Sequence, residues 1–222
     1  CWASALFLRS LFSLVSGFHC GLSLYLFFRL TRHPRFTQCC SSAASDLYTR
    51  QILAQSTLTL GCIHFHRAEF SAAMNFIQQS LTQCADSSPE QRRSRHDPVV
   101  FSLIYQAWYQ WESGLPDQAL ATILTAVDIA KRGGHPFCIG IAFAFQASMH
   151  LYRGEYGQCI KLASQSVTAS NEPGYRTWIA WANVLQGRAR CAADETRAKG
   201  LKEMISGLKL WDERGAIVTR PY

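Results

Sequence analysis

The residues best suited to chemistry are one cysteine and two histidines in a short stretch, Cys62, His64 and His66. Thiolates and imidazoles are preferred zinc ligands, and a structural zinc site uses four of them. The stretch has a helical pattern, in which residues two positions apart point in nearly opposite directions, so only Cys62 and His66 share a face. Two ligands do not complete a site. We therefore expect no metal here, and no residue is assigned to metal or cofactor binding.

Signals for catalysis are equally weak. The adjacent carboxylates Asp194-Glu195 and Asp212-Glu213 fall near expected helix ends, where charge is solvated and carboxyl pKa values are not raised for acid catalysis. The chain has no G-x-x-x-x-G-K-[ST] phosphate loop, no G-x-G-x-x-G turn and no G-x-S-x-G nucleophile elbow. We predict a chain without catalytic residues and without enzymatic activity of its own.

Composition and charge narrow the class of protein. The 222 residues include 13 Phe, 8 Tyr and 6 Trp, too many aromatic residues for a disordered chain. Four arginines and no acid occur in residues 1–44, so the net charge of +7 is concentrated there and the remainder is nearly balanced. The run Arg92-Arg93-Ser94-Arg95 falls in a predicted loop, and we interpret it as solvated surface. We expect no nucleic-acid partner.

The first 44 residues form a segment of their own. Residues 10–28 contain no charged side chain, and this 19-residue length is just enough for a helix to span ~30 Å of hydrocarbon. Three interpretations remain open: a membrane helix or signal peptide, a translated extension that does not fold with the rest, or a packed helix. If the segment spans a membrane, Arg29, Arg32 and Arg35 place the body in the cytoplasm.

The nine cysteines indicate a reducing compartment. Their number is odd, no C-x-x-C pair occurs, and most predicted helices hold a single cysteine. Buried, reduced thiols fit this pattern, so we expect a cytoplasmic body.

From Ser56 onward the chain alternates long helical patterns with short turns, and the pattern repeats. Ala68, Gly114 and Gly154 each close a first helix, where a positive φ is expected. Small residues then recur in each second helix, seven positions apart, so that the two helices can lie close together: Ala73 and Ser80, Ala119 and Ala126, Cys159 and Ser166, Gly200 and Gly207. Residues 45–222 are thus predicted to be one all-α, right-handed superhelix (α-solenoid) of about four helical hairpins, preceded by the apolar N-terminal helix.

This pattern resembles tetratricopeptide (TPR) repeats. Three strings resemble the TPR region of signalling proteins in which an adenylate/guanylate cyclase or kinase domain precedes a P-loop ATPase and the repeats: DPVVFSLIYQAWYQWESGLPDQAL (97–120), GHPFCIGIAFAFQASMHLYRGE (134–155) and GLKLWDERGAIVTRPY (207–222). The resemblance implies a non-catalytic protein-interaction or regulatory module from a larger protein. A membrane-tethered helical adaptor anchored by residues 10–28, and a fragment without independent function, are the alternatives. Uncapped repeat ends expose apolar surface, which favours self-association.

A protein or peptide ligand is expected in the groove that the first helices of such an array line. Aromatic residues and arginine are favoured at binding hot spots, although aromatic residues at helical spacing more often belong to a core. Glu112 beside Trp111 favours exposure of Trp111 over Trp108. The predicted groove residues are Phe65, His66, Ile104, Trp108, Trp111, Glu112, Ser148, Tyr152, Asn183 and Arg188.

Overall fold

The computed structural model describes residues 42–170, 176–192 and 197–213, which form eight α-helices and no strand. The helices are α2 (Ser42–His66), α3 (Phe70–Gln83), α4 (Pro98–Glu112), α5 (Pro116–Gly133), α6 (Pro136–Tyr152), α7 (Tyr156–Ala169), α8 (Arg176–Ala192) and α9 (Arg197–Asp212). The all-α prediction is confirmed for these residues. The apolar segment 10–28 lies outside them, and none of the eight described helices is long and apolar enough to cross a membrane.

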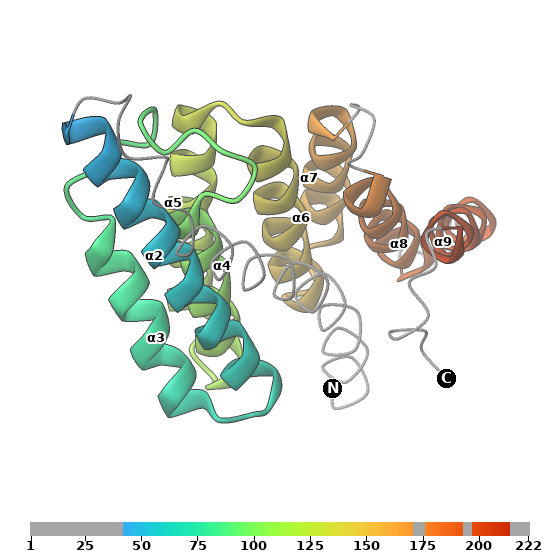
Figure 1. The fold of residues 1–222 in the computed structure, drawn as a ribbon. Coiled ribbons are helices and arrows are strands. Elements are labelled where there is room, and N and C mark those ends of the chain that lie inside the picture. Colours follow the sequence, from blue (N-terminus) through green and yellow to red (C-terminus); the bar gives the residue numbers. More distant parts are fainter. Residues whose placement is uncertain (1–41, 171–175, 193–196, 214–222) are drawn as a thin grey trace. The chain divides into compact units, whose positions relative to one another are not determined.

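The helices belong to two compact units that divide between Ser88 and Pro89. The first unit contains the hairpin α2–α3, and the second contains α4 to α9. Within the second unit each helix packs on the next along the chain, and the first helices of successive hairpins, α4, α6 and α8, also touch (Figure 1). Helical hairpins stacked in chain order are consistent with the α-solenoid that the repeat predicts.

The turns between the helices of a hairpin have the backbone geometry expected from the sequence. Ala68, Gly114 and Gly154 all have positive φ, at 63°, 78° and 76°. One residue after each, a backbone N–H donates to a carbonyl five residues earlier, and the N–O distance is 2.9 Å in all three hairpins. Such a bond satisfies a carbonyl left open at the helix end, and the αL residue makes it reachable. Ala68 is the one non-glycine residue with positive φ in the described part of the chain.

Small residues let the two helices of each hairpin approach closely. All eight small residues of the predicted repeat are buried. The Ser80 hydroxyl donates to the Ala54 carbonyl at 2.9 Å, and the Ser166 hydroxyl donates to the Gly140 carbonyl at 2.7 Å. In the last hairpin, a Cβ added to Gly200 would lie only 2.5 Å from the carbonyl oxygen of Gly187. The predicted role of the small positions is confirmed.

The basic loop before α4 differs from its sequence-based interpretation. Arg92 is only 4% exposed, and its Nε lies 3.2 Å from Oδ1 of Asp97. The same carboxylate accepts from the Val99 backbone N–H at 2.9 Å, which caps α4. Burial raises the pKa of Asp97, although the Arg92 charge opposes this. The guanidinium of Arg95 lies 4.6 Å from the ring centre of Phe137. Solvated surface is therefore the wrong description of Arg92, which forms a buried ion pair, whereas Arg93 and Arg95 are exposed as predicted.

Candidate partner-binding site

Aromatic rings join the first helices of the second unit. Trp108 of α4 lies 5.8 Å from Phe145 of α6, and Phe145 lies 4.6 Å from Trp181 of α8. Trp178 continues the series to Trp181 at 5.8 Å and to Phe137 at 5.4 Å. All five rings are buried, so they form the core between these helices rather than a surface.

The ten predicted groove residues consequently fall into two groups, one buried and one partly or fully exposed. Phe65, Ile104, Trp108 and Ser148 are 3%, 0%, 5% and 2% exposed, which leaves their side chains almost no surface for a partner. Their helical spacing fits a core as well as a groove, and in the structure they lie in the core. Partly or fully exposed are His66, Trp111, Glu112, Tyr152, Asn183 and Arg188, of which His66 belongs to the first unit.

Four of the exposed residues come together where α4 and α6 end and α8 passes; we name Trp111, Glu112, Tyr152 and Arg188 the rim cluster. The Trp111 and Tyr152 ring centres are 5.3 Å apart with planes inclined by 41°. The indole N–H of Trp108 donates to Oε1 of Glu112 at 3.2 Å, which fixes this carboxylate beside the rings. The cluster therefore combines two half-buried aromatic rings with an anchored acid.

The hydroxyl of Tyr152 is influenced by the charges of both Arg188 and Glu112. Burial raises the pKa of its hydroxyl well above the usual value; Arg188 acts to lower it and Glu112 acts to raise it. The phenol therefore stays protonated at neutral pH and can donate a hydrogen bond. No nucleophile with an adjacent base is present among these four residues.

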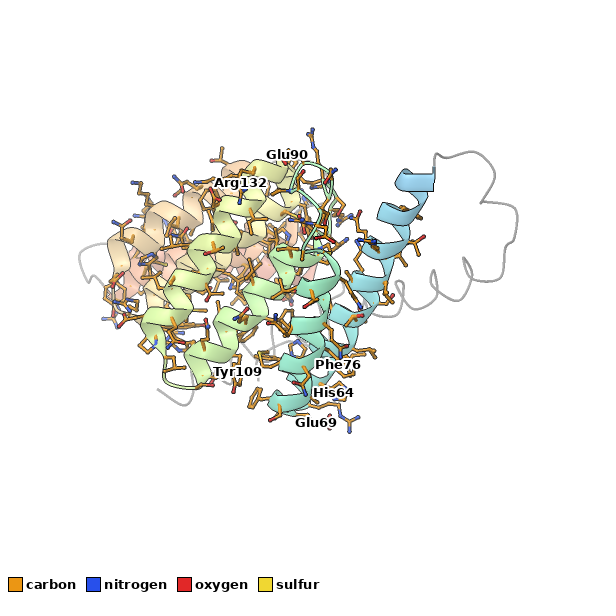
Figure 2. The ribbon with its side chains drawn as sticks, turned by 90° about the vertical axis from the view of Figure 1, so that its left-hand side faces the viewer. His64, Glu69, Phe76, Glu90, Tyr109 and Arg132 are labelled. Carbon is orange, nitrogen blue, oxygen red and sulfur yellow. The ribbon has the colours of Figure 1, made fainter. Side chains whose placement is uncertain are left out.

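A histidine, an arginine and a carboxylate also come together in the first unit, at the turn between α2 and α3. Nδ1 of His64 lies 2.5 Å from Oε2 of Glu69, and Nε of Arg67 donates to Oε1 of the same carboxylate at 2.8 Å. The His64 ring stacks on Phe76 at 5.2 Å, and Figure 2 shows His64, Glu69 and Phe76 gathered at this end of the hairpin. Such a histidine–carboxylate pair resembles those that orient catalytic bases.

Its recurrence argues for a structural role. His150, Arg153 and Glu155 repeat the same contacts at the α6–α7 turn, with the same distances of 2.5 Å and 2.8 Å. Each counterpart lies 86 positions further along the chain, from 64 to 150 and from 69 to 155. We name both arrangements turn clamps. The shared His, Arg and Glu are visible in the strings HFHRAEF (64–70) and HLYRGEY (150–156), but the repeat pattern of turn and small residues does not include them.

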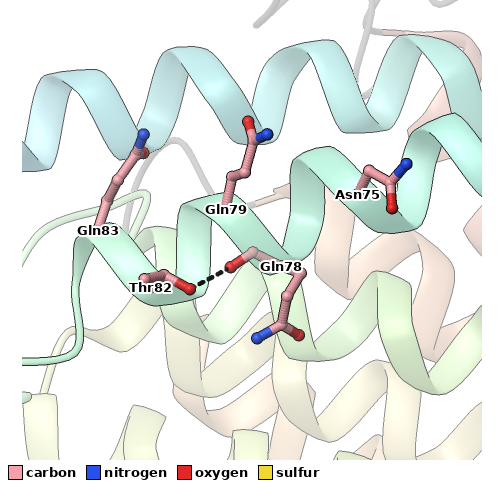
Figure 3. A pocket seen from close by; sticks show the side chains of 5 residues that line it. All are labelled: Asn75, Gln78, Gln79, Thr82 and Gln83. Carbon is pink, nitrogen blue, oxygen red and sulfur yellow. Dashed lines mark hydrogen bonds between the residues drawn. The ribbon is translucent and has the colours of Figure 1, made fainter.

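The remaining features of the described residues offer little chemistry. No three His, Cys, Asp or Glu side chains within them are grouped to hold a metal ion. A hollow of about 530 Å³ lies along α3 (Figure 3) and is lined by neutral polar side chains: Asn75, Gln78, Gln79, Thr82 and Gln83. The Thr82 hydroxyl donates to the Gln78 carbonyl at 2.9 Å. Amides and a hydroxyl without a charged neighbour provide neither an acid, a base nor a nucleophile.

No protein family, curated protein or solved structure matches this chain. The likeness to TPR regions therefore rests on the residues themselves, and the rim cluster has to be interpreted from its own geometry.

Proposed function

We propose that this chain is a non-catalytic helical-repeat module that binds a protein or peptide at the rim cluster. One observation carries the proposal: Trp111 and Tyr152 touch across two successive first helices while both remain partly exposed. Partly exposed aromatic rings beside charged groups are the composition that binding hot spots favour. In the same proposal the hairpins form a right-handed, TPR-like superhelix within a larger cyclase- or kinase–ATPase-type signalling protein, where partner binding would regulate the catalytic domains.

The chemistry of the rim cluster suggests what a ligand segment would contain. The two rings would cover an apolar or aromatic side chain of the ligand. Arg188 would donate hydrogen bonds to a carboxylate or main-chain carbonyl, and Glu112 would accept a hydrogen bond from an N–H or pair with a cation. An extended or turn-forming peptide that combines one apolar anchor with flanking polar groups meets these requirements.

Site-specific photocrosslinking of the full chain tests the proposal. p-Benzoylphenylalanine replaces Trp111 in one variant and Leu124 in the control, because Leu124 is a 48% exposed residue of α5 away from the rim cluster. We expect a discrete protein adduct from the source-cell extract at position 111 and none at 124, and loss of that adduct when Arg188→Glu is added. Equal adducts at both positions, or an adduct that survives Arg188→Glu, would contradict the proposal.

A further inference from the structure

Glu112 differs from most other carboxylates of the described residues in having no ion pair. Seven of these carboxylates lie within 3.6 Å of an arginine or histidine nitrogen: Glu69, Asp86, Asp97, Asp117, Asp128, Glu155 and Glu203. The polar contact of Glu112 is instead the neutral indole N–H of Trp108, at 3.2 Å. Within the part of the chain that the structure describes, its negative charge is therefore anchored by a hydrogen bond but not paired with a cation.

The contact with Trp108 holds the Glu112 carboxylate in place and leaves it accessible. Trp108 is only 5% exposed, so its indole is fixed in the core, whereas Glu112 is exposed. An ionised carboxylate can accept several hydrogen bonds, so one contact leaves most of its accepting capacity for a ligand. Because the side chain is already ordered, less conformational entropy is lost when a ligand group binds to it.

Two aromatic rings accompany this carboxylate. Trp111 precedes Glu112 in the last turn of α4, and its ring centre lies 5.3 Å from that of Tyr152. Both residues are half-buried, so each ring keeps part of its surface open. Burial raises the pKa of the Tyr152 hydroxyl, Arg188 lowers it, and Glu112 raises it further, so the Glu112 charge is close to this ring as well. The faces of aromatic rings attract lysine and arginine cations, and tryptophan does so most strongly.

We propose that the rim cluster recognises a lysine or arginine side chain of its ligand, with the cationic head at Glu112 and the aliphatic stem on the rings of Trp111 and Tyr152. This inference rests on the proposed function and names the ligand group that the cluster selects. Lysine and arginine bury an apolar stem while the charged head stays near solvent, so one residue supplies both the apolar anchor and the cation. Arg188 belongs to α8 and repels a cation on its own side, which places the bound cation on the α4 side of the cluster. Arg188 is then left for a carbonyl or carboxylate of the same ligand.

Fluorine NMR of the full-length chain labelled with fluorotryptophan tests this charge preference, and the Trp111 signal is identified by its loss in Trp111→Phe. The probes are acetyl-Gly-Gly-Lys-Gly-Gly-amide and the same peptide with norleucine in place of lysine, which keeps an apolar stem and has no charge. We expect the lysine peptide to bind at least about 5-fold more tightly, because it adds a cation–π contact and an ion pair at a surface site. Glu112→Gln keeps an oxygen that can accept from Trp108, and it should weaken binding of the lysine peptide by about 3- to 10-fold without changing that of the norleucine peptide. Asp128→Asn is the matched control, because it removes an exposed carboxylate that pairs with Arg132 near the other end of α5, and it should bind both peptides like the wild type.

Three results would overturn the proposal. Equal affinity for the two peptides would show that the rim cluster binds without selecting a cation. An unchanged affinity of Glu112→Gln for the lysine peptide, or an equal loss in Asp128→Asn, would show that Glu112 is not the carboxylate that recognises it. A Trp111 signal that does not change with the lysine peptide up to about 10 mM would exclude a cation site of even millimolar affinity. Photocrosslinking at position 111 tests the proposed function separately, so a discrete adduct there together with any of these three results rejects only the cation preference.

Discussion

Two neighbouring glycines should respond to alanine with opposite signs, which tests the geometry of the hairpin turn. Gly154 has φ of 76° and Gly157 lies in the first turn of α7 without a positive φ; a Cβ added at either would meet nothing within 4 Å. Any difference between them must therefore arise from backbone conformation. An L-residue in the left-handed region costs roughly 1–2 kcal/mol, and the lower entropy of the unfolded alanine chain returns roughly 0.4–1 kcal/mol.

Gly154→Ala is therefore expected to lower the free energy of unfolding by about 1 kcal/mol. Gly157→Ala is expected to raise the free energy of unfolding by about 0.5 kcal/mol. This is the low end of the gain for a helical glycine, because Gly157 lies at the end of its helix. The reverse change at the matching turn, Ala68→Gly, should stabilise, since Ala68 holds φ of 63°. Urea unfolding followed by circular dichroism measures all three. Stabilisation by Gly154→Ala, or equal effects at 154 and 157, would refute the turn geometry.

Three further predictions concern packing, a buried ion pair and pH. Gly200→Ala should lower the free energy of unfolding by about 1–3 kcal/mol, because the added Cβ would lie 2.5 Å from the Gly187 carbonyl oxygen. Thermal unfolding measures this change. An unchanged unfolding midpoint would contradict the close approach of α8 and α9. Asp97→Asn should lower the free energy of unfolding by about 3 kcal/mol, since it deprives buried Arg92 of its carboxylate. Asp128→Asn, in the exposed pair with Arg132, should lower it by under about 0.5 kcal/mol. Urea unfolding measures both, and similar losses would refute the burial of the Arg92–Asp97 pair. Hydrogen bonds from Arg153 and His150 hold the pKa of Glu155 below its usual 4.5, so its contribution to stability is present above that pH and declines as pH falls through the lowered value. Glu155→Gln should remove this part of the acid dependence of the unfolding midpoint, and an unchanged acid profile would show that the clamp is not formed.

The sequence predicted those parts of the fold that depend on local geometry. Positive φ at Ala68, Gly114 and Gly154 follows from the need to end a helix sharply, and burial of Ser80 and Ser166 follows from the close approach of paired helices. These requirements act within one hairpin, so the same types of residue recur at regular positions in the sequence.

The site was harder to predict because helical spacing gives the same pattern for a core and for a groove. Trp108 and Trp111 are three residues apart, yet Trp108 is 5% exposed and Trp111 is half-buried. Trp108 meets the buried Phe145 of α6 at 5.8 Å, whereas Trp111 lies in the last turn of α4 and meets the half-buried Tyr152. Contacts of this kind depend on how hairpins stack, which no single stretch of sequence contains. The buried Arg92 was misinterpreted for the same reason, because its partner Asp97 becomes a cap only when α4 has formed.

The proposed partner binds where α4 and α6 end, beside Arg188 of α8. Hydrogen exchange of the full-length chain, with and without the partner captured at position 111, tests it most directly. We expect slower exchange at the ends of α4 and α6 and around Arg188, and unchanged exchange along α3. Protection confined to α3, or to the second helices α5 and α7, would place the partner elsewhere and contradict the rim cluster as the binding site.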